Sequence, residues 1–191
     1  FDQRVEELPN GAQFVWTSPT LRVVQRFELT RGLRSSDFDA VQMQVSVSNE
    51  GEEPVLVGAR LFFDTYLGER TNVHFVTPGS DAITRETEFE PGPVNAYVAS
   101  VAGADAAYGF QIMLTDGEVT EPARAVVANW KRLTDSTWEY EVNPTRNFNR
   151  LPYSINDSAL LVVYEPVQLR TDERFAITTR FGDLSPDGYL P

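Results

Sequence analysis

Residues 41–64 read VQMQVSVSNEGEEPVLVGARLFFD, and two alternating runs in this stretch decide the fold class. Every second residue from 41 to 47 is apolar, and a second such run extends over residues 55–63. Successive strand residues point to opposite faces of a sheet, so both runs are typical of half-buried antiparallel strands. Residues 49–54 between them include Asn, Gly and Pro, and we expect the two runs to pair as one long hairpin.

The alternation continues outward from this stretch. It recurs over residues 21–29, and further strands are expected at residues 13–17, 73–76, 83–89, 96–101, 108–114, 125–129, 137–141, 159–164 and 174–181. Ten or more short strands separated by turn residues predict an all-β protein, a large antiparallel two-sheet β-sandwich. Little helix is expected beyond a turn at residues 81–87 or 121–127.

Residues 1–191 are expected to form a single β-sandwich domain. A chain of 191 residues is long enough to bury a core of this kind, and no repeat or linker divides it. The breaker Glu-Pro-Gly-Pro at residues 90–93 is interpreted as a crossover between the two sheets.

Composition excludes several classes of function. The net charge of −12, from 28 acidic and 16 basic residues, disfavours binding to a phosphate backbone, so no nucleic acid partner is expected. The absence of cysteine excludes disulfides, thiolate catalysis and cysteine-ligated metals. Apolar stretches such as residues 159–163 are far too short to cross a bilayer, so no membrane span is expected.

His74 is the only histidine, and we interpret it as a structural residue. A catalytic triad would also need a positioned serine and acid, and the chain has no Gly-x-Ser-x-Gly elbow. Sites with two or three histidines are impossible, and no acidic loop has the full spacing of a calcium site. We therefore expect neither a metal site nor a cofactor.

Asp64 directly follows the apolar strand of residues 55–63. An acid in this place either points into a site at the end of the sheet, where burial raises its pKa, or caps the amides of residues 65–68. We favour the cap. An enzyme that uses carboxylates would need Asp64 together with Glu69 or Asp157 in one cleft.

A second candidate site gathers aromatic and cationic side chains over residues 129–150. Its tentative ligand-binding residues are Trp130, Trp138, Tyr140, Arg146 and Arg150. Such groups can stack on sugar rings and donate hydrogen bonds to hydroxyls. The alternative is that the aromatic residues fill the core of strands and that both arginines pair with surface acids.

Four stretches carry a resemblance to a kind of bacterial envelope protein: residues 47–51 (VSNEG), 57–68 (VGARLFFDTYLG), 156–166 (NDSALLVVYEP) and 180–182 (RFG). Together they resemble a periplasmic or secreted β-sandwich domain, with spirochaetes as one group that would carry it. The resemblance implies a periplasmic or secreted location, with an N-terminal signal absent from this chain.

The strand pattern is also similar to the supersandwich of galactose-mutarotase-like and glycosidase accessory domains. Mutarotases of that fold use catalytic histidines with a glutamate base, whereas this chain has one histidine. The resemblance therefore implies sugar binding or assembly more than epimerase activity.

These observations favour a module without catalysis over an enzyme. We expect a non-catalytic cell-envelope or secreted β-sandwich module that mediates protein–protein assembly, with an envelope protein as partner. The first alternative is a carbohydrate-binding domain with a glycan partner. The second is a carboxylate-based carbohydrate-active enzyme.

Overall fold

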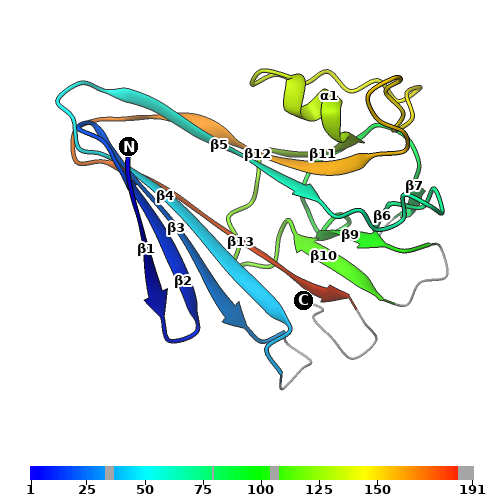
Figure 1. Ribbon diagram of the computed structural model, residues 1–191, viewed down its shortest axis with the longest axis horizontal. Helices are drawn as coiled ribbons and strands as arrows, with labels where there is room; N and C mark the ends of the chain where they lie inside the picture. Colours follow the sequence, from blue (N-terminus) through cyan, green and yellow to red (C-terminus); the bar gives the residue numbers. More distant parts are fainter. Residues whose placement is uncertain (33–36, 79, 104–107, 185–191) are drawn as a thin grey trace.

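The structure, a computed structural model, describes residues 1–32, 37–78, 80–103 and 108–184. Two antiparallel sheets dominate it (Figure 1), and 55% of the chain is strand against 3% helix. The predicted all-β sandwich is therefore confirmed.

The large sheet has nine strands, in the order β1 (Asp2–Leu8), β2 (Gly11–Thr17), β3 (Leu21–Thr30), β4 (Ala40–Asn49), β13 (Arg174–Leu184), β10 (Gly109–Met113), β9 (Tyr97–Val101), β6 (Phe75–Thr77) and β7 (Ser80–Ile83). The small sheet has four, in the order β5 (Val55–Asp64), β12 (Ser158–Leu169), β11 (Arg124–Asn129) and β8 (Thr87–Phe89). A short helix, α1 (Trp130–Asp135), follows β11. Within the described ranges, no helix has the length and hydropathy of a membrane span.

The predicted hairpin of β4 and β5 is wrong, because the two strands belong to different sheets. β4 pairs with β3 and β13 in the large sheet, whereas β5 pairs with β12 in the small one. The turn between them is held by the buried side chain of Asn49, which donates to the backbone oxygens of Glu53 (2.9 Å) and Leu169 (3.1 Å). Alternation reveals which face of a strand is buried, but not which strand lies beside it.

Other predicted elements differ in detail. Residues 83–89 divide between β7 and β8, which lie in different sheets, and residues 137–141 form no strand. The helix forms at α1 instead of at residues 81–87 or 121–127, and the Asn129 side chain caps it by accepting from the Arg132 amide at 3.1 Å. Residues 90–93 do carry the chain from β8 in the small sheet to β9 in the large one, as predicted.

The two faces of β12 support two apolar clusters. Leu160 and Val162 face the large sheet and pack in the cluster that includes Ile177 of β13. Leu161 and Val163 face the other way and pack against residues that include Leu133 of α1. All seven residues from 158 to 164 are buried, so this strand is the centre of the structure.

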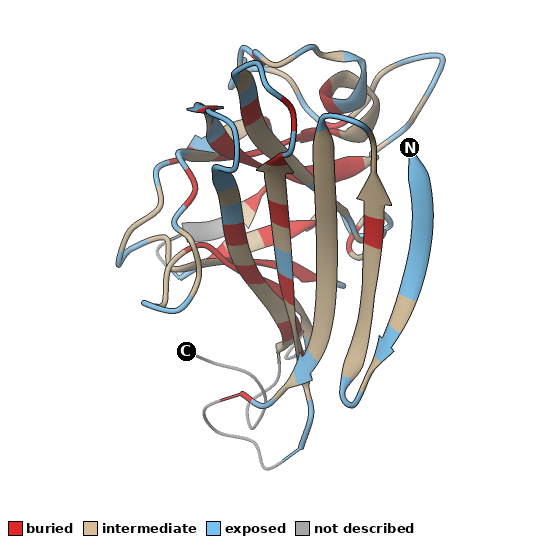
Figure 2. Ribbon diagram, turned by 90° about the vertical axis from the view of Figure 1, so that its left-hand side faces the viewer, coloured by how far each residue is buried: buried red, intermediate tan, exposed pale blue. Residues whose placement is uncertain are grey.

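Strands β1, β2 and β3 lie beyond this packing. Among the described residues, none of these three strands contributes to an apolar core cluster. Figure 2 shows β1 exposed along most of its length. The large sheet therefore extends past the small sheet on the side of the N-terminal strands.

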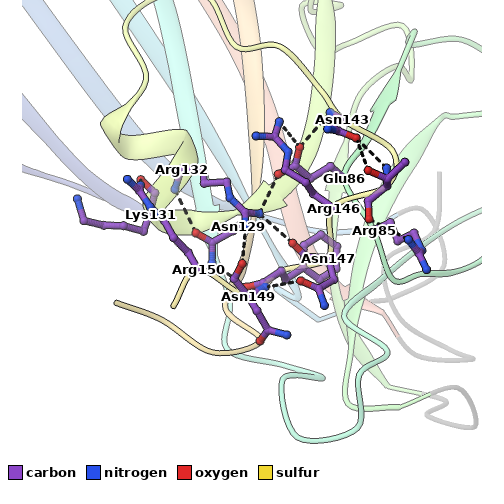
Figure 3. A network of polar contacts seen from close by, with 12 residues as sticks. Arg85, Glu86, Asn129, Lys131, Arg132, Asn143, Arg146, Asn147, Asn149 and Arg150 are labelled. Carbon is purple, nitrogen blue, oxygen red and sulfur yellow. Dashed lines mark hydrogen bonds and ion pairs between the residues drawn. The ribbon is translucent and has the colours of Figure 1, made fainter. Parts of the chain in front are cut away.

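A buried carboxylate attaches α1 and residues 137–148 to the sandwich (Figure 3). Glu86, between β7 and β8, has a fully buried side chain. Its Oε1 accepts from Arg132 Nη1 and the Tyr140 hydroxyl, both at 2.9 Å. Its Oε2 accepts from Arg146 Nη2 at 2.7 Å and the Asn143 amide at 3.0 Å. Four donors thus satisfy one carboxylate, which is what a buried charge requires.

We expect Glu86→Gln to lower the free energy of unfolding by about 2 kcal/mol or more, because the glutamine loses the charge and turns its amide group toward donors. Denaturant unfolding measures this change. Glu88→Gln is a matched control, since this partly exposed acid has only a 3.5 Å ion pair with Arg124, and we expect a loss below about 0.5 kcal/mol. Equal losses in the two variants would contradict the assigned role of Glu86.

Candidate acidic site at the end of the small sheet

Three carboxylates meet at one end of the small sheet. Asp64 is the last residue of β5, Asp157 directly precedes β12, and Glu69 lies in the connection from β5 to β6. One carboxylate oxygen of each residue lies within 4.8 Å of the others. The predicted carboxylate site combined Asp64 with either Glu69 or Asp157, and the structure brings all three together. We call this cluster the acidic trio.

The pairing of β5 with β12 brings two members of the acidic trio together. The strands are antiparallel, and Asp64 is paired with Ala159. Asp157 lies two residues before Ala159, so it comes next to the point where β5 ends. Two residues far apart in the sequence therefore share one end of the sheet.

The loop that carries Asp157 is held by Asn129. The Asn129 side-chain amide donates to the backbone oxygens of Asp157 (2.9 Å) and Phe148 (2.7 Å), and to Ser154 Oγ at 2.9 Å. Asn129 is itself completely buried at the end of β11. No pattern in the sequence marks Asn129 as a positioning residue.

The loop that carries Glu69 is fixed by its neighbours. Gly68 has a φ of 77°, and a Cβ atom there would lie 1.9 Å from the Val73 oxygen, so only glycine fits. The Asn156 side-chain amide donates to the backbone oxygen of Glu69 and links this loop to the one before β12. Asn156 also has a positive φ of 54°, a conformation that asparagine tolerates better than most residues.

The electrostatics of the acidic trio favour a bound proton. Burial, followed by repulsion from Asp157 and Asp64, raises the pKa of Glu69 to about 7. Burial and then the charge of Asp64 raise the pKa of Asp157. Burial also raises the pKa of Asp64, while a hydrogen bond from the Tyr66 backbone opposes this shift and fits the predicted cap. In the described part of the chain, none of the three has an ion pair.

Such a cluster can do two kinds of chemistry. A carboxyl group with a pKa near neutrality can donate or accept a proton at neutral pH. Carboxylate oxygens are also the ligands that Ca²⁺ and Mg²⁺ prefer, and the spacing of these three would allow them to hold one ion.

An open pocket adjoins the acidic trio. It has a volume of about 460 Å³ and is lined by Phe62, Phe63, Asp64, Thr65, Leu67 and Phe110. Phe62 is 39% exposed, and Tyr66 in the following loop is 65% exposed. Apolar walls with a few polar groups are typical of small-molecule sites.

His74 lies inside the protein, as its structural interpretation required. It is fully buried, its Nδ1 is 2.6 Å from Ser158 Oγ, and its ring meets Phe148 edge-on at 5.0 Å. Burial lowers its pKa, although a hydrogen bond with Asn156 opposes this shift. The histidine therefore supports the residue after Asp157 and has no access to solvent.

The aromatic residues of the second candidate site lie on the outer face of the small sheet. Tyr140 is buried and donates to Glu86. Trp130 and Trp138 are half-buried and pack against the apolar cluster on that face. The Trp138 ring also covers Gly58, where a Cβ atom would lie 2.6 Å from its Cη2.

Both arginines of that candidate site have partners within the chain. Arg146 pairs with Glu86 at 2.7 Å, and Arg150 pairs with Asp135 at 2.5 Å. These contacts match the alternative in which the arginines pair with acids, although Glu86 is a buried acid and not a surface one. Glycan binding by these residues stays a prediction.

No protein-family model and no curated protein matches the chain. Among solved structures, it is similar to a galactose mutarotase related enzyme from Lactobacillus acidophilus, with a TM-score of 0.54 and 10% identity over 100% of this chain and 74% of that one. A galactose mutarotase-like protein from Lactobacillus casei has a TM-score of 0.54 and 10% identity over 96% of this chain and 73% of that one. A polysaccharide lyase has a TM-score of 0.50 and 14% identity over 93% of this chain, which spans only 22% of the lyase. At such identities the likeness shows the fold, which is that of galactose mutarotase-like β-sandwich proteins.

Proposed function

We propose that the chain binds a saccharide at the acidic trio and the adjoining pocket. The observation that carries the proposal is the convergence of three carboxylates beside an open apolar pocket. Carboxylate oxygens accept hydrogen bonds from sugar hydroxyls, and an exposed ring such as Phe62 offers an apolar surface to the carbon face of a sugar. The pocket has the size of a small-molecule site.

The fold supports a sugar as the ligand. The structural relatives include a galactose mutarotase related enzyme and a polysaccharide lyase. Fold likeness alone does not transfer a function, so the support lies in its agreement with the acidic trio.

The second candidate function is a carboxylate-based carbohydrate-active enzyme, and the pKa of Glu69 favours it. A carboxyl group with a pKa of about 7 can serve as general acid and general base at neutral pH. Because the only histidine is buried, proton transfer to a bound sugar would fall to Glu69, with Asp64 and Asp157 as neighbouring carboxylates.

The assembly role with an envelope protein partner and the periplasmic or secreted location remain separate predictions. Recovery of the chain as a free monomer, with no stable complex in envelope extracts, would argue against the assembly role. Neither prediction depends on the saccharide site.

We expect galactose, glucose or their oligosaccharides to bind the wild-type protein, with NMR shift changes centred on the acidic trio. At about pH 8, where Glu69 is largely ionised, Glu69→Gln and Asp157→Asn should each raise the Kd about tenfold or more, because each removes a charge-assisted hydrogen bond. Glu50→Gln is the control, since this exposed acid lies in the turn at the opposite end of β5 from Asp64, and its Kd should not change.

Three outcomes would contradict this site. They are an absence of binding at millimolar sugar, shift changes centred on Trp130 and Trp138 instead, and binding that disappears in EDTA and returns with Ca²⁺. The last would make the acidic trio a cation site, so the titration is repeated in EDTA, where we expect the same Kd.

Glu69 should also make stability depend on pH. Its folded-state pKa of about 7 exceeds the ordinary value of 4.5, so folding favours the protonated form. This stabilisation is complete below about pH 4.5 and is lost as the pH rises through 7. We expect thermal unfolding of Glu69→Gln to show a shallower loss of stability over this window and a higher Tm than wild type at about pH 8. Parallel curves for the two proteins would contradict the shifted pKa.

A further inference from the structure

The strand β1 forms an open edge of the large sheet. It is the outermost strand, and in the described part of the chain it pairs only with β2. In an antiparallel ladder alternate residues direct their amide and carbonyl groups toward the partner, so every second residue of β1 directs these groups away from the sheet. Such an edge is a template for a further strand. Figure 1 shows β1 on the side of the molecule away from α1.

Apolar side chains on the inner face of the large sheet reach this edge at Val5, which lies between Gln3 and Glu7 on the same face of β1. In the strand register, Val5 lies opposite Phe14, and the same row continues through Gln25 and Val45 to Ile177 in the core. Val5, at the outer end of the row, is 57% exposed. Apolar side chains therefore recur past the part that the small sheet covers, with Gln25 as a polar member of the row.

Aromatic rings lie next to Val5 on this face. Phe14 and Trp16 stack with ring centroids 6.0 Å apart, and Phe27 meets Phe14 edge-on at 6.1 Å. All three rings are only half-buried. A neighbouring sheet that continued this face would cover Val5 and extend the row of rings.

We propose that β1 pairs antiparallel with β1 of a second copy of this chain, about a two-fold axis at Val5. The two large sheets then form one continuous sheet, with their apolar faces on the same side. The sequence Asp-Gln-Arg-Val-Glu-Glu-Leu of residues 2–8 fits this register. Val5 lies opposite Val5 of the second copy, and Arg4 lies opposite Glu6 of the second copy. The two-fold axis repeats the ion pair, and opposite charges across a ladder stabilise it.

The charges disfavour the neighbouring registers. A two-fold axis at residue 4 would set Arg4 against Arg4 of the second copy, and Asp2 against Glu6. An axis at residue 6 would set Glu6 against Glu6 of the second copy. Arg4 and Glu6 already share one face, with Nε and Oε1 2.8 Å apart, and both side chains are partly exposed. Of the registers centred on residues 4, 5 and 6, only the one centred on Val5 sets opposite charges against one another. A register centred on Gln3 would also set Arg4 against Asp2 of the second copy, but it would pair only residues 2–4 of β1, whereas the register centred on Val5 pairs the whole strand.

Sedimentation velocity over a micromolar to millimolar series tests the proposal. We expect wild type to dimerise reversibly toward twice 21.4 kDa. Arg4→Glu and Glu6→Arg should each raise the dimer Kd about tenfold or more, because each sets like charges against one another twice. An equimolar mixture of the two variants should dimerise again, since one then carries acids at positions 4 and 6 and the other carries arginines.

The mixture separates pairing between chains from pairing within one chain, because mixing cannot restore an ion pair inside a single variant. Arg85→Glu is the control: it changes the net charge equally at an exposed residue between β7 and β8, and its Kd should equal that of wild type. Circular dichroism confirms that each variant is folded. A wild type that stays monomeric, single variants that still dimerise, or a mixture that stays monomeric would each overturn the proposal.

Discussion

The register of β12 against β5 is the constraint on which most of the structure depends. With Ala159 opposite Asp64, Leu160 and Val162 face the large sheet, while Leu161 and Val163 face α1. A shift of one residue would exchange these two sets, so both apolar clusters require this register. The same register places Asp157 beside the end of β5. Core packing and the candidate site therefore have one origin.

The sequence predicted which face of a strand is buried, but it did not predict which strands lie side by side. Alternation over residues 41–64 identified two half-buried strands, but it contains no information about partners, so the hairpin was wrong. Asp64 and Asp157 were recognisable as acids at strand ends, whereas their meeting depends on β12 lying beside β5. Residues 129–150 are rich in aromatic and cationic side chains, and this composition suits a ligand-binding surface and a packed segment of the fold equally well. The residue that makes this segment part of the fold is Glu86, which pairs with Arg132 and Arg146 but lies far from them in the sequence. The helix that Asn129 caps was not predicted, because its six residues are too few to show a periodic row of apolar side chains.

Acidic residues occupy two opposite environments in this protein. Glu86 has four donors and no exposed side-chain surface, so its interactions serve the fold. The acidic trio has three carboxylates close together, and the pKa of each is raised. Groups kept in a destabilising arrangement are characteristic of functional sites, where stability is lowered to retain reactivity. Composition alone cannot separate the two cases, because both use the same side chains.

The positions of β12 and β13 have a consequence for how the chain folds. β13 lies between β4 and β10, and β12 lies between β5 and β11, so the two strands that come latest among the described residues are interior strands of the two sheets. During synthesis β4, β5, β10 and β11 emerge first, and they stay unpaired on one side until β12 and β13 have been made. Strand pairs that are far apart in the sequence slow folding, and strand edges remain unpaired until these pairs have formed. This architecture therefore exposes the nascent chain to aggregation until β12 and β13 have been made.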